Sequence, residues 1–301
     1  MKQKINLAAK GFCMGAADVV PGVSGGTMAF ILGIYAQLLA AIRSFDVVWL
    51  QYIFKLQIKS AVQRPHFNFL IPLFIGIVCA LLFFTRIVPL PVFLHTHPEL
   101  VYGLFFGLIL ASIIILLPEI KPFKISTVFY LIIGITMGWL IVNLVPMNTP
   151  DTASFIFFSG MLAISAMLLP GISGSFILLI LHKYDTILNA IGHFNFMVLI
   201  PFGLGVVTGL VVFSRLISWL LASFYHNTVT IIIGILIGSL WVIWPFQTRE
   251  YITVHNKERL IDSTPYWPDV WNDTVMYSIF MMLAGLGLVL IIYVWSKQKH
   301  N

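Results

Sequence analysis

The stretch Val20-Pro21-Gly22-Val23-Ser24-Gly25-Gly26-Thr27 interrupts an apolar run over residues 11–42. A proline-glycine pair breaks regular structure, and the small polar residues that follow can begin a new helix. The same order of residue types returns at 169–176, which reads Leu-Pro-Gly-Ile-Ser-Gly-Ser-Phe. Four residues are identical at a constant shift of 149 positions: Pro21, Gly22, Ser24 and Gly25 match Pro170, Gly171, Ser173 and Gly174. A register shared over more than twenty residues indicates an internal duplication.

A second block of matches lies further along both copies. Residues 70–72 and 76 match 199–201 and 205, and Arg86 matches Arg215, at a shift of 129 positions. The smaller shift means that the first copy holds about twenty extra residues between Arg43 and Asn68. We therefore expect two repeats, 1–150 with its break at 20–27 and 151–301 with its break at 169–176.

The composition identifies the class of protein. Of the 301 residues 59% are hydrophobic and only 9% are charged, whereas soluble domains carry about 25% charged residues. Together with a mean hydropathy of +0.99, these values predict a polytopic membrane protein. The net charge of +6 then reports membrane topology and not nucleic-acid binding. Cys13 and Cys79 have no metal or redox spacing, and no cofactor or metal is expected.

Basic residues predict that both ends of the first apolar run lie in the cytoplasm, because cytoplasmic loops are enriched in Lys and Arg. They are Lys2, Lys4 and Lys10 before the run and Arg43, Lys55, Lys59 and Arg64 after it. The run has about 32 residues, while two complete crossings need roughly 40. A re-entrant helix hairpin with its tip at Pro21-Gly22 satisfies both conditions, and such a tip must face the protein interior.

Six further apolar runs are long enough to span a bilayer. They are 67–85, 100–117 and 126–145 in the first copy and 193–214, 227–244 and 274–296 in the second, which also has its own re-entrant stretch at 152–191. The expected fold is an all-α polytopic membrane protein of two inverted repeats, each a re-entrant hairpin plus about three transmembrane helices. Both termini are expected in the cytoplasm, and such repeats place transport sites at their interface.

The loop 247–273 conflicts with this topology, because it would be external and yet carries Arg249, Lys257 and Arg259. The sequence therefore does not assign this loop to one side of the membrane. Trp267 and Trp271 in the same loop are typical of interfacial anchors.

The two break motifs can be interpreted in two ways. Backbone N–H groups and hydroxyls at a helix start attract anions, phosphate above all. One cradle would comprise Ser24, Gly25, Gly26 and Thr27, and the other Ser173, Gly174 and Ser175. Alternatively, Pro-Gly only breaks a helix and the small residues allow close packing. The repetition of the motif favours binding.

Three charged residues are further candidates for the site. Arg86 and Arg215 stand at equivalent repeat positions, and an arginine fork matches phosphate oxygens, although snorkelling to lipid headgroups is the alternative. Asp18 precedes Pro21 and has no acidic counterpart in the second repeat. An acid in an apolar run favours a functional role, either paired with a cation or exchanging protons in coupling, and helix capping is the alternative.

Other residues receive structural interpretations. Asp185, His182 and Glu119 are more typical of interfacial positions. The G-x-x-x-G pairs, Gly103 with Gly107 and Gly234 with Gly238, indicate helix packing.

Residues 15–27, Gly-Ala-Ala-Asp-Val-Val-Pro-Gly-Val-Ser-Gly-Gly-Thr, and the later Pro170-Gly171-Ile172-Ser173-Gly174-Ser175 resemble a bacterial membrane family. That family, long described as a domain of unknown function, is regarded as transporters of polyprenyl phosphate, that is undecaprenyl phosphate. The resemblance covers nearly the whole chain. The second motif departs from the first where Gly26 and Thr27 become Ser175 and Phe176.

The resemblance implies transport of the lipid carrier from the outer to the inner leaflet of the bacterial cytoplasmic membrane, for reuse in peptidoglycan and other envelope polymers. The partner is then the lipid polyprenyl phosphate in the membrane. Because inward movement of its negative headgroup opposes an inside-negative potential, we expect a proton or cation as the coupling ion. The oligomeric state is left open. Two other classes are weighed against this function. One is an ion-coupled transporter or channel for a small anion. The other is a membrane phosphatase, but Ser214-Arg215 lacks the following histidine expected of the acid phosphatase superfamily, so no enzyme is predicted.

Overall fold

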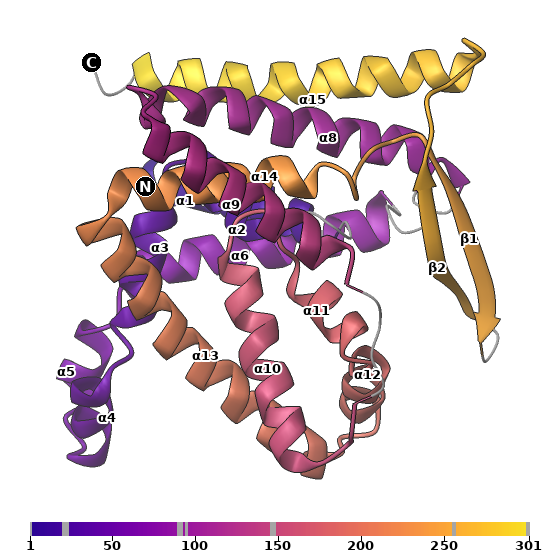
Figure 1. Cartoon of the computed structure of the whole chain (residues 1–301). Coiled ribbons are helices and arrows are strands. Elements are labelled where there is room, and N and C mark those ends of the chain that lie inside the picture. Colours follow the sequence, from indigo (N-terminus) through magenta and orange to yellow (C-terminus); the bar gives the residue numbers. More distant parts are fainter. Residues whose placement is uncertain are drawn as a thin grey trace.

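A computed structural model of the chain describes residues 2–19, 24–88, 93, 96–144, 149–254 and 257–298. The predicted hairpin tip at Pro21-Gly22 lies outside these residues, as does Lys299. Helices dominate the described structure, and its two ends, Lys2 and Gln298, lie on the same side of the molecule (Figure 1). The expected helical, polytopic membrane protein is confirmed, while its inverted repeats stay a prediction.

The first half begins with three helices, α1 (Lys2–Asp18), α2 (Gly25–Ile31) and α3 (Tyr35–Arg43), and α2 and α3 meet at an angle of 118°. The extra residues of this half form two short helices, α4 (Val47–Phe54) and α5 (Ile58–Gln63). The remaining elements are α6 (Phe67–Leu82), the π-helical turn η1 (Phe83–Ile87), α8 (Pro98–Leu116), the 3-10 turn η2 (Leu117–Ile120) and α9 (Ile125–Val142).

The second half has the same order of elements. It comprises α10 (Ala153–Leu168), α11 (Gly174–Ile180), α12 (Tyr184–Gly192), α13 (Phe196–Ser223), α14 (Tyr225–Ser239) and α15 (Asp273–Gln298). Helices α11 and α12 begin and end 149 positions after α2 and α3, and α13 begins 129 positions after α6. The helices therefore follow the two sequence shifts.

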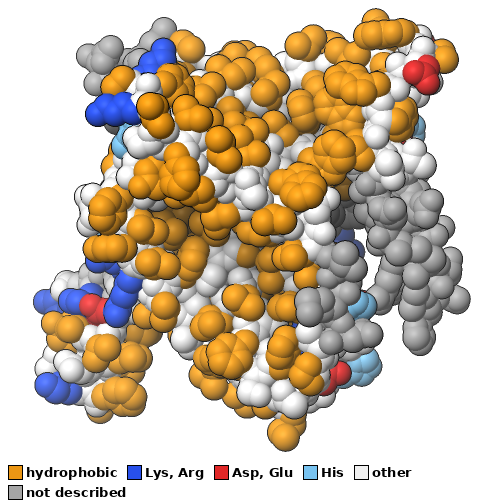
Figure 2. Space-filling model, viewed as in Figure 1, with side chains coloured by type: hydrophobic (Ala, Val, Ile, Leu, Met, Phe, Trp, Pro, Cys, Tyr) orange, Lys and Arg blue, Asp and Glu red, His pale blue; other side chains and the backbone are white. Residues whose placement is uncertain are grey.

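Within the described residues, four helices are long and apolar enough to cross a membrane, and the bent pair α2–α3 would make a fifth span. They cover Pro98–Ile120, Ile125–Val142, Phe196–Ser223 and Asp273–Ile291. The runs predicted at 67–85 and 227–244 contain shorter α-helices, because α6 changes to π-helical hydrogen bonding at Phe83 and α14 ends at Ser239. Hydrophobic side chains cover the face shown in Figure 2, as expected of a surface in contact with lipid.

The segment predicted as a loop at 247–273 contains a β-hairpin instead. Strands β1 (Gln247–Val254) and β2 (Lys257–Pro265) pair antiparallel, with Gln247 opposite Pro265 and Val254 opposite Lys257. Residues of high strand propensity, such as Tyr251 and Ile252, supply the local preference. Trp267 and Trp271 follow the hairpin with exposed indoles.

The long helices associate in pairs: α1 with α6, α10 with α13, α8 with α15 and α9 with α14. Glycines allow these close contacts. A Cβ atom at Gly107 would overlap the Met282 carbonyl oxygen of α15, and one at Gly234 would lie 2.7 Å from the Cα atom of Gly134 in α9. The structure thus supports the packing interpretation of the G-x-x-x-G pairs, since membrane helices gain contact area through small residues.

Candidate functional site

The hydroxyls of the first motif are buried and reach the second half of the chain. Ser24 precedes α2, where its Oγ accepts a hydrogen bond from the Gly26 N–H at 3.1 Å and donates one to the Met167 carbonyl oxygen at 3.2 Å. Thr27 Oγ1 accepts a hydrogen bond from the Gly171 N–H at 2.8 Å. Since both side chains are 1% exposed, the first motif packs directly on the second.

A tyrosine adds to this contact between the halves. The buried Tyr35 hydroxyl donates to the Leu168 carbonyl oxygen at 2.7 Å. A Cβ atom at Gly26 would lie 2.7 Å from the Met167 carbonyl oxygen, so only glycine permits this approach. Sequence reasoning did not identify Tyr35 as a contact residue, although its match to Tyr184 at the 149-residue shift was an available signal.

The predicted anion cradle at Ser24, Gly25, Gly26 and Thr27 has its polar groups engaged in this conformation. The Gly25 N–H donates to Asp18 Oδ1 at 2.7 Å, and the other groups form the bonds described above. An anion could bind these four residues only after α2 had moved away from its neighbours.

The second motif is arranged differently. Ser173 precedes α11, and its Oγ lies 2.8 Å from the Oγ of Ser175. Ser173 is half-buried and Ser175 is exposed, while Gly174 packs closely on the backbone of Ala163. These hydroxyls, unlike those of Ser24 and Thr27, are accessible from outside the protein.

Asp18 ends α1 and holds the start of α2 through its bond to the Gly25 N–H. A Cβ atom at Gly25 would lie 2.6 Å from the carboxylate. Asp18 forms no ion pair with any described residue. The geometry shows that this half-buried carboxylate caps a helix, the alternative raised from the sequence, and it leaves ion coupling as a proposal.

The structure places the two candidate arginines on separate elements. Arg86 lies in η1, which packs on α6, while Arg215 lies in α13, which packs on α10, α3, α12 and α14. Both side chains are exposed, and neither has an ion pair within the described part of the chain. The structure does not bring them together.

The weaker candidates lie at helix ends. Glu119 in η2 accepts a hydrogen bond from the Tyr225 hydroxyl at 3.4 Å. His182 occupies the turn before α12 with a positive φ of 52°, and Asp185 lies in the first turn of α12. In the described ranges no three His, Cys, Asp or Glu side chains cluster as metal ligands would.

Sequence reasoning missed a buried cation. Lys183 is 1% exposed, and its Nζ donates to Asp151 Oδ1 at 2.6 Å and to the Thr149 carbonyl oxygen at 2.8 Å. Lys10 similarly donates to the Leu32 carbonyl oxygen at 2.8 Å. A lysine thus stabilises the bend of each short helix pair, α2–α3 and α11–α12. A lysine within an apolar stretch was the sequence signal that could have identified both residues.

Comparison with known proteins identifies relatives over most of the chain. A family model described as undecaprenyl phosphate translocase-like matches residues 14–261. The chain is 43% identical to a polyprenyl-phosphate transporter of Vibrio cholerae serotype O1, covering 93% of each protein. It is 36% identical to a polyprenyl-phosphate transporter of Staphylococcus aureus, covering 78% of this chain and 84% of that protein. No solved structure matches.

Proposed function

This chain belongs to the undecaprenyl phosphate translocase-like family, and we propose that it moves undecaprenyl phosphate from the outer to the inner leaflet of the bacterial cytoplasmic membrane. This movement returns the lipid carrier for reuse in peptidoglycan and other envelope polymers. The observation that carries the proposal is the direct contact between the two repeated segments. Thr27 accepts a hydrogen bond from the Gly171 N–H of the second motif, and Ser24 donates one to the carbonyl of Met167 just before that motif.

The substrate explains why such polar groups are needed inside the membrane. A polyprenyl tail can remain in lipid, so only the headgroup requires a path through the protein. That headgroup carries about −1.5 to −2 charges near neutral pH, taking the values of phosphorylated side chains as a guide. Accessible hydroxyls at Ser173 and Ser175 and the fork of Arg215 supply donors that a phosphate can use.

We propose that the halves 1–150 and 151–301 are inverted repeats with a re-entrant hairpin each. The matching bounds of α2 and α11 and of α3 and α12 support the repeat. By the order of elements, α14 corresponds to α8 and α15 to α9. Since α8 pairs with α15 and α9 with α14, each half packs its last two helices against those of the other half in a symmetric way, which supports the repeat. The start of α1 and the end of α15 lie on one side of the molecule, which supports a common cytoplasmic location of the termini (Figure 1).

Transport then requires the contact between the motifs to open. When α2 separates from Met167 and Leu168, the hydroxyls of Ser24 and Thr27 and the N–H of Gly171 become free to bind phosphate oxygens. Arg86 and Arg215 would receive the headgroup at opposite ends of this path, since equivalent residues of inverted repeats face opposite sides.

Coupling to a proton or cation would make inward movement favourable. Each negative charge that moves against an inside-negative potential costs roughly 2.3 kcal/mol per 100 mV. Asp18 is our candidate for the coupling group, because its carboxylate contacts the start of α2 and would respond to any displacement of that helix.

The test is protein-dependent movement of a polyprenyl phosphate in sealed proteoliposomes, with the exposed headgroup measured by an impermeant phosphate-binding probe. We expect loss of the exposed pool only when protein is present. Uptake of a small anion such as inorganic phosphate without lipid movement would contradict the proposal and favour the transporter of a water-soluble anion.

A further inference from the structure

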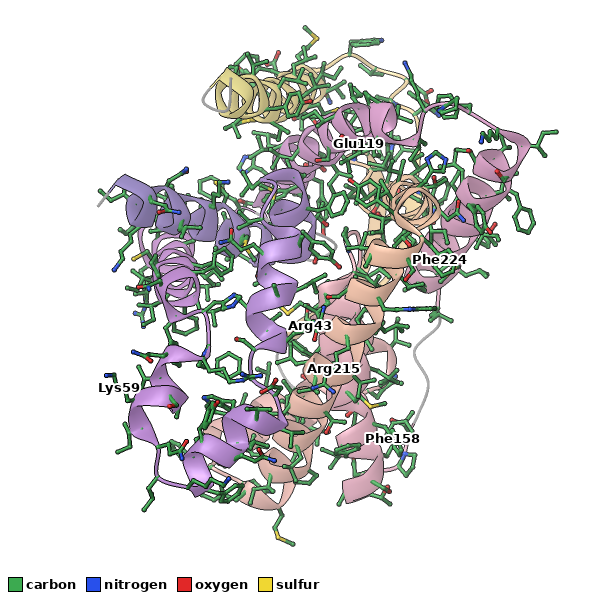
Figure 3. All side chains as sticks on the ribbon, turned by 90° about the vertical axis from the view of Figure 1, so that its left-hand side faces the viewer. Arg43, Lys59, Glu119, Phe158, Arg215 and Phe224 are labelled. Atoms are coloured by element: carbon green, nitrogen blue, oxygen red, sulfur yellow. The ribbon has the colours of Figure 1, made fainter. Side chains whose placement is uncertain are left out.

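A third arginine, Arg43, lies on a helix that packs against the helix of Arg215. Arg43 is the last residue of α3, and α3 packs against α13, which carries Arg215. Figure 3 shows both side chains on the same face of the molecule, one from each half of the chain. Both are exposed, and neither forms an ion pair with a described residue.

The carboxylate nearest to Arg43 along the chain is already occupied. Asp46 accepts hydrogen bonds from Arg64, with Nε to Oδ1 at 2.8 Å and a terminal nitrogen to Oδ2 at 2.5 Å. The guanidinium groups of Arg43 and Arg215 lie on one face (Figure 3), and no carboxylate among the described residues forms an ion pair with either. Like charges in this arrangement repel each other, and a ligand with two negative charges relieves the repulsion.

The repeat makes this pair asymmetric. Arg215 matches Arg86 at the 129-residue shift, whereas Arg43 matches Gly192 at the 149-residue shift. The repeat therefore gives Arg86 with Gly192 as the counterpart of the pair Arg215 with Arg43, and this counterpart holds one arginine where the pair holds two. Two guanidinium groups can contact more phosphate oxygens than one can.

We propose that Arg43 and Arg215 together form a binding site for a phosphate monoester headgroup at the cytoplasmic end of the path, while Arg86 acts alone at the other end. This inference rests on the proposed function. It names the substrate class more narrowly, because a monoester dianion can engage both forks, while the phosphodiester of an ordinary phospholipid carries one charge. The tighter site retains the headgroup on the side where the carrier is reused.

The test measures binding of farnesyl monophosphate to the purified full-length protein in neutral phosphatidylcholine nanodiscs, with farnesol as the probe that lacks the headgroup. We expect Arg43→Gln and Arg215→Gln each to weaken farnesyl monophosphate binding about tenfold, because each removes charge-assisted hydrogen bonds. The double variant should lose less than about threefold more, since one phosphate needs both groups. Farnesol binding should not change.

Lys59→Gln is the matched control, because Lys59 is also an exposed cation but lies on α5, apart from the two arginines (Figure 3). It should bind the probe within about twofold of the original protein. Arg43→Lys, which keeps the charge but loses the fork, should bind several-fold more weakly and serves if Arg43→Gln does not fold.

Separate outcomes overturn separate claims. If the original protein binds farnesyl monophosphate no better than farnesol, the proposed function itself is contradicted. If the original protein binds the monophosphate, and Arg43→Gln and Arg43→Lys bind it as tightly as the original protein does, Arg43 is not part of the site. Fully additive losses in the double variant would mean that the two arginines act independently, which contradicts a site that needs both groups together.

Discussion

Replacing Thr27 by valine tests the contact between the two motifs. Valine has nearly the same shape as threonine but lacks the hydroxyl that accepts the Gly171 N–H at 2.8 Å. Thr27 is 1% exposed, so no water would replace the lost acceptor. The variant leaves a buried N–H group unsatisfied, which costs about 1–3 kcal/mol.

The assay is thermal unfolding of the detergent-solubilised protein, followed by the loss of monodisperse material. A change of this size should lower the melting temperature by several degrees, taking about 2–4 °C per kcal/mol as for larger domains. Thr208→Val is the control, because the half-buried Thr208 hydroxyl donates to the Leu204 carbonyl of its own helix and bridges no other element among the described hydrogen bonds. Its melting temperature should stay within about 1 °C.

Transport provides a second readout for Thr27→Val. In the proposed transport cycle this contact opens, so weakening it should increase the population of the open state and leave transport measurable. An unchanged melting temperature would refute the claim that this hydrogen bond holds the two halves together. A Thr208→Val effect as large as that of Thr27→Val would refute the specificity of the contact.

Three further substitutions test other parts of the structure. Asp18→Asn keeps an oxygen that can cap the Gly25 N–H but removes the negative charge, so transport should fall and lose its pH dependence. Full transport with an unchanged pH profile would contradict the coupling role and leave only helix capping for Asp18. Gly107→Ala should destabilise the protein strongly in thermal unfolding because the new Cβ overlaps a backbone oxygen of α15, whereas Gly287→Ala, with open space around it, should not; equal melting temperatures would contradict the packing. Arg64 lowers the pKa of Asp46 to about 2, so this ion pair stabilises α4–α5 above about pH 4 and its contribution is lost as the pH falls toward 2. Backbone hydrogen exchange over 47–63, corrected for its intrinsic rate, should therefore accelerate between these pH values. The Arg64→Gln variant should show no such transition.

Much of the fold is predictable from the sequence because the chain repeats itself. The shift of 149 positions predicts that α11 and α12 follow the bounds of α2 and α3, and the extra residues near 44–66 form α4 and α5. The β-hairpin after Gln247 was not predicted, since a rule that counts basic residues says nothing about strand pairing.

The site was less accessible to sequence reasoning. A Ser-Gly motif at a helix start suits an anion and a close backbone contact equally well, and the choice depends on neighbours distant in the chain. Ser24 and Thr27 contact Met167 and Gly171, which no local pattern reveals. Repetition indicated that the motifs matter, and only tertiary structure showed that they meet.

The most direct test of the central claim is the amount of undecaprenyl phosphate exposed on the surface of living cells, measured with a headgroup-specific probe. Cells that lack this protein and any redundant carrier recycler should accumulate the lipid outside. The original protein should reverse the accumulation, and a well-expressed Arg86→Ala, Arg215→Ala double variant should not. No accumulation in cells without the protein would contradict its role as a translocase of this lipid, and complete rescue by the double variant would contradict the role of the two arginines.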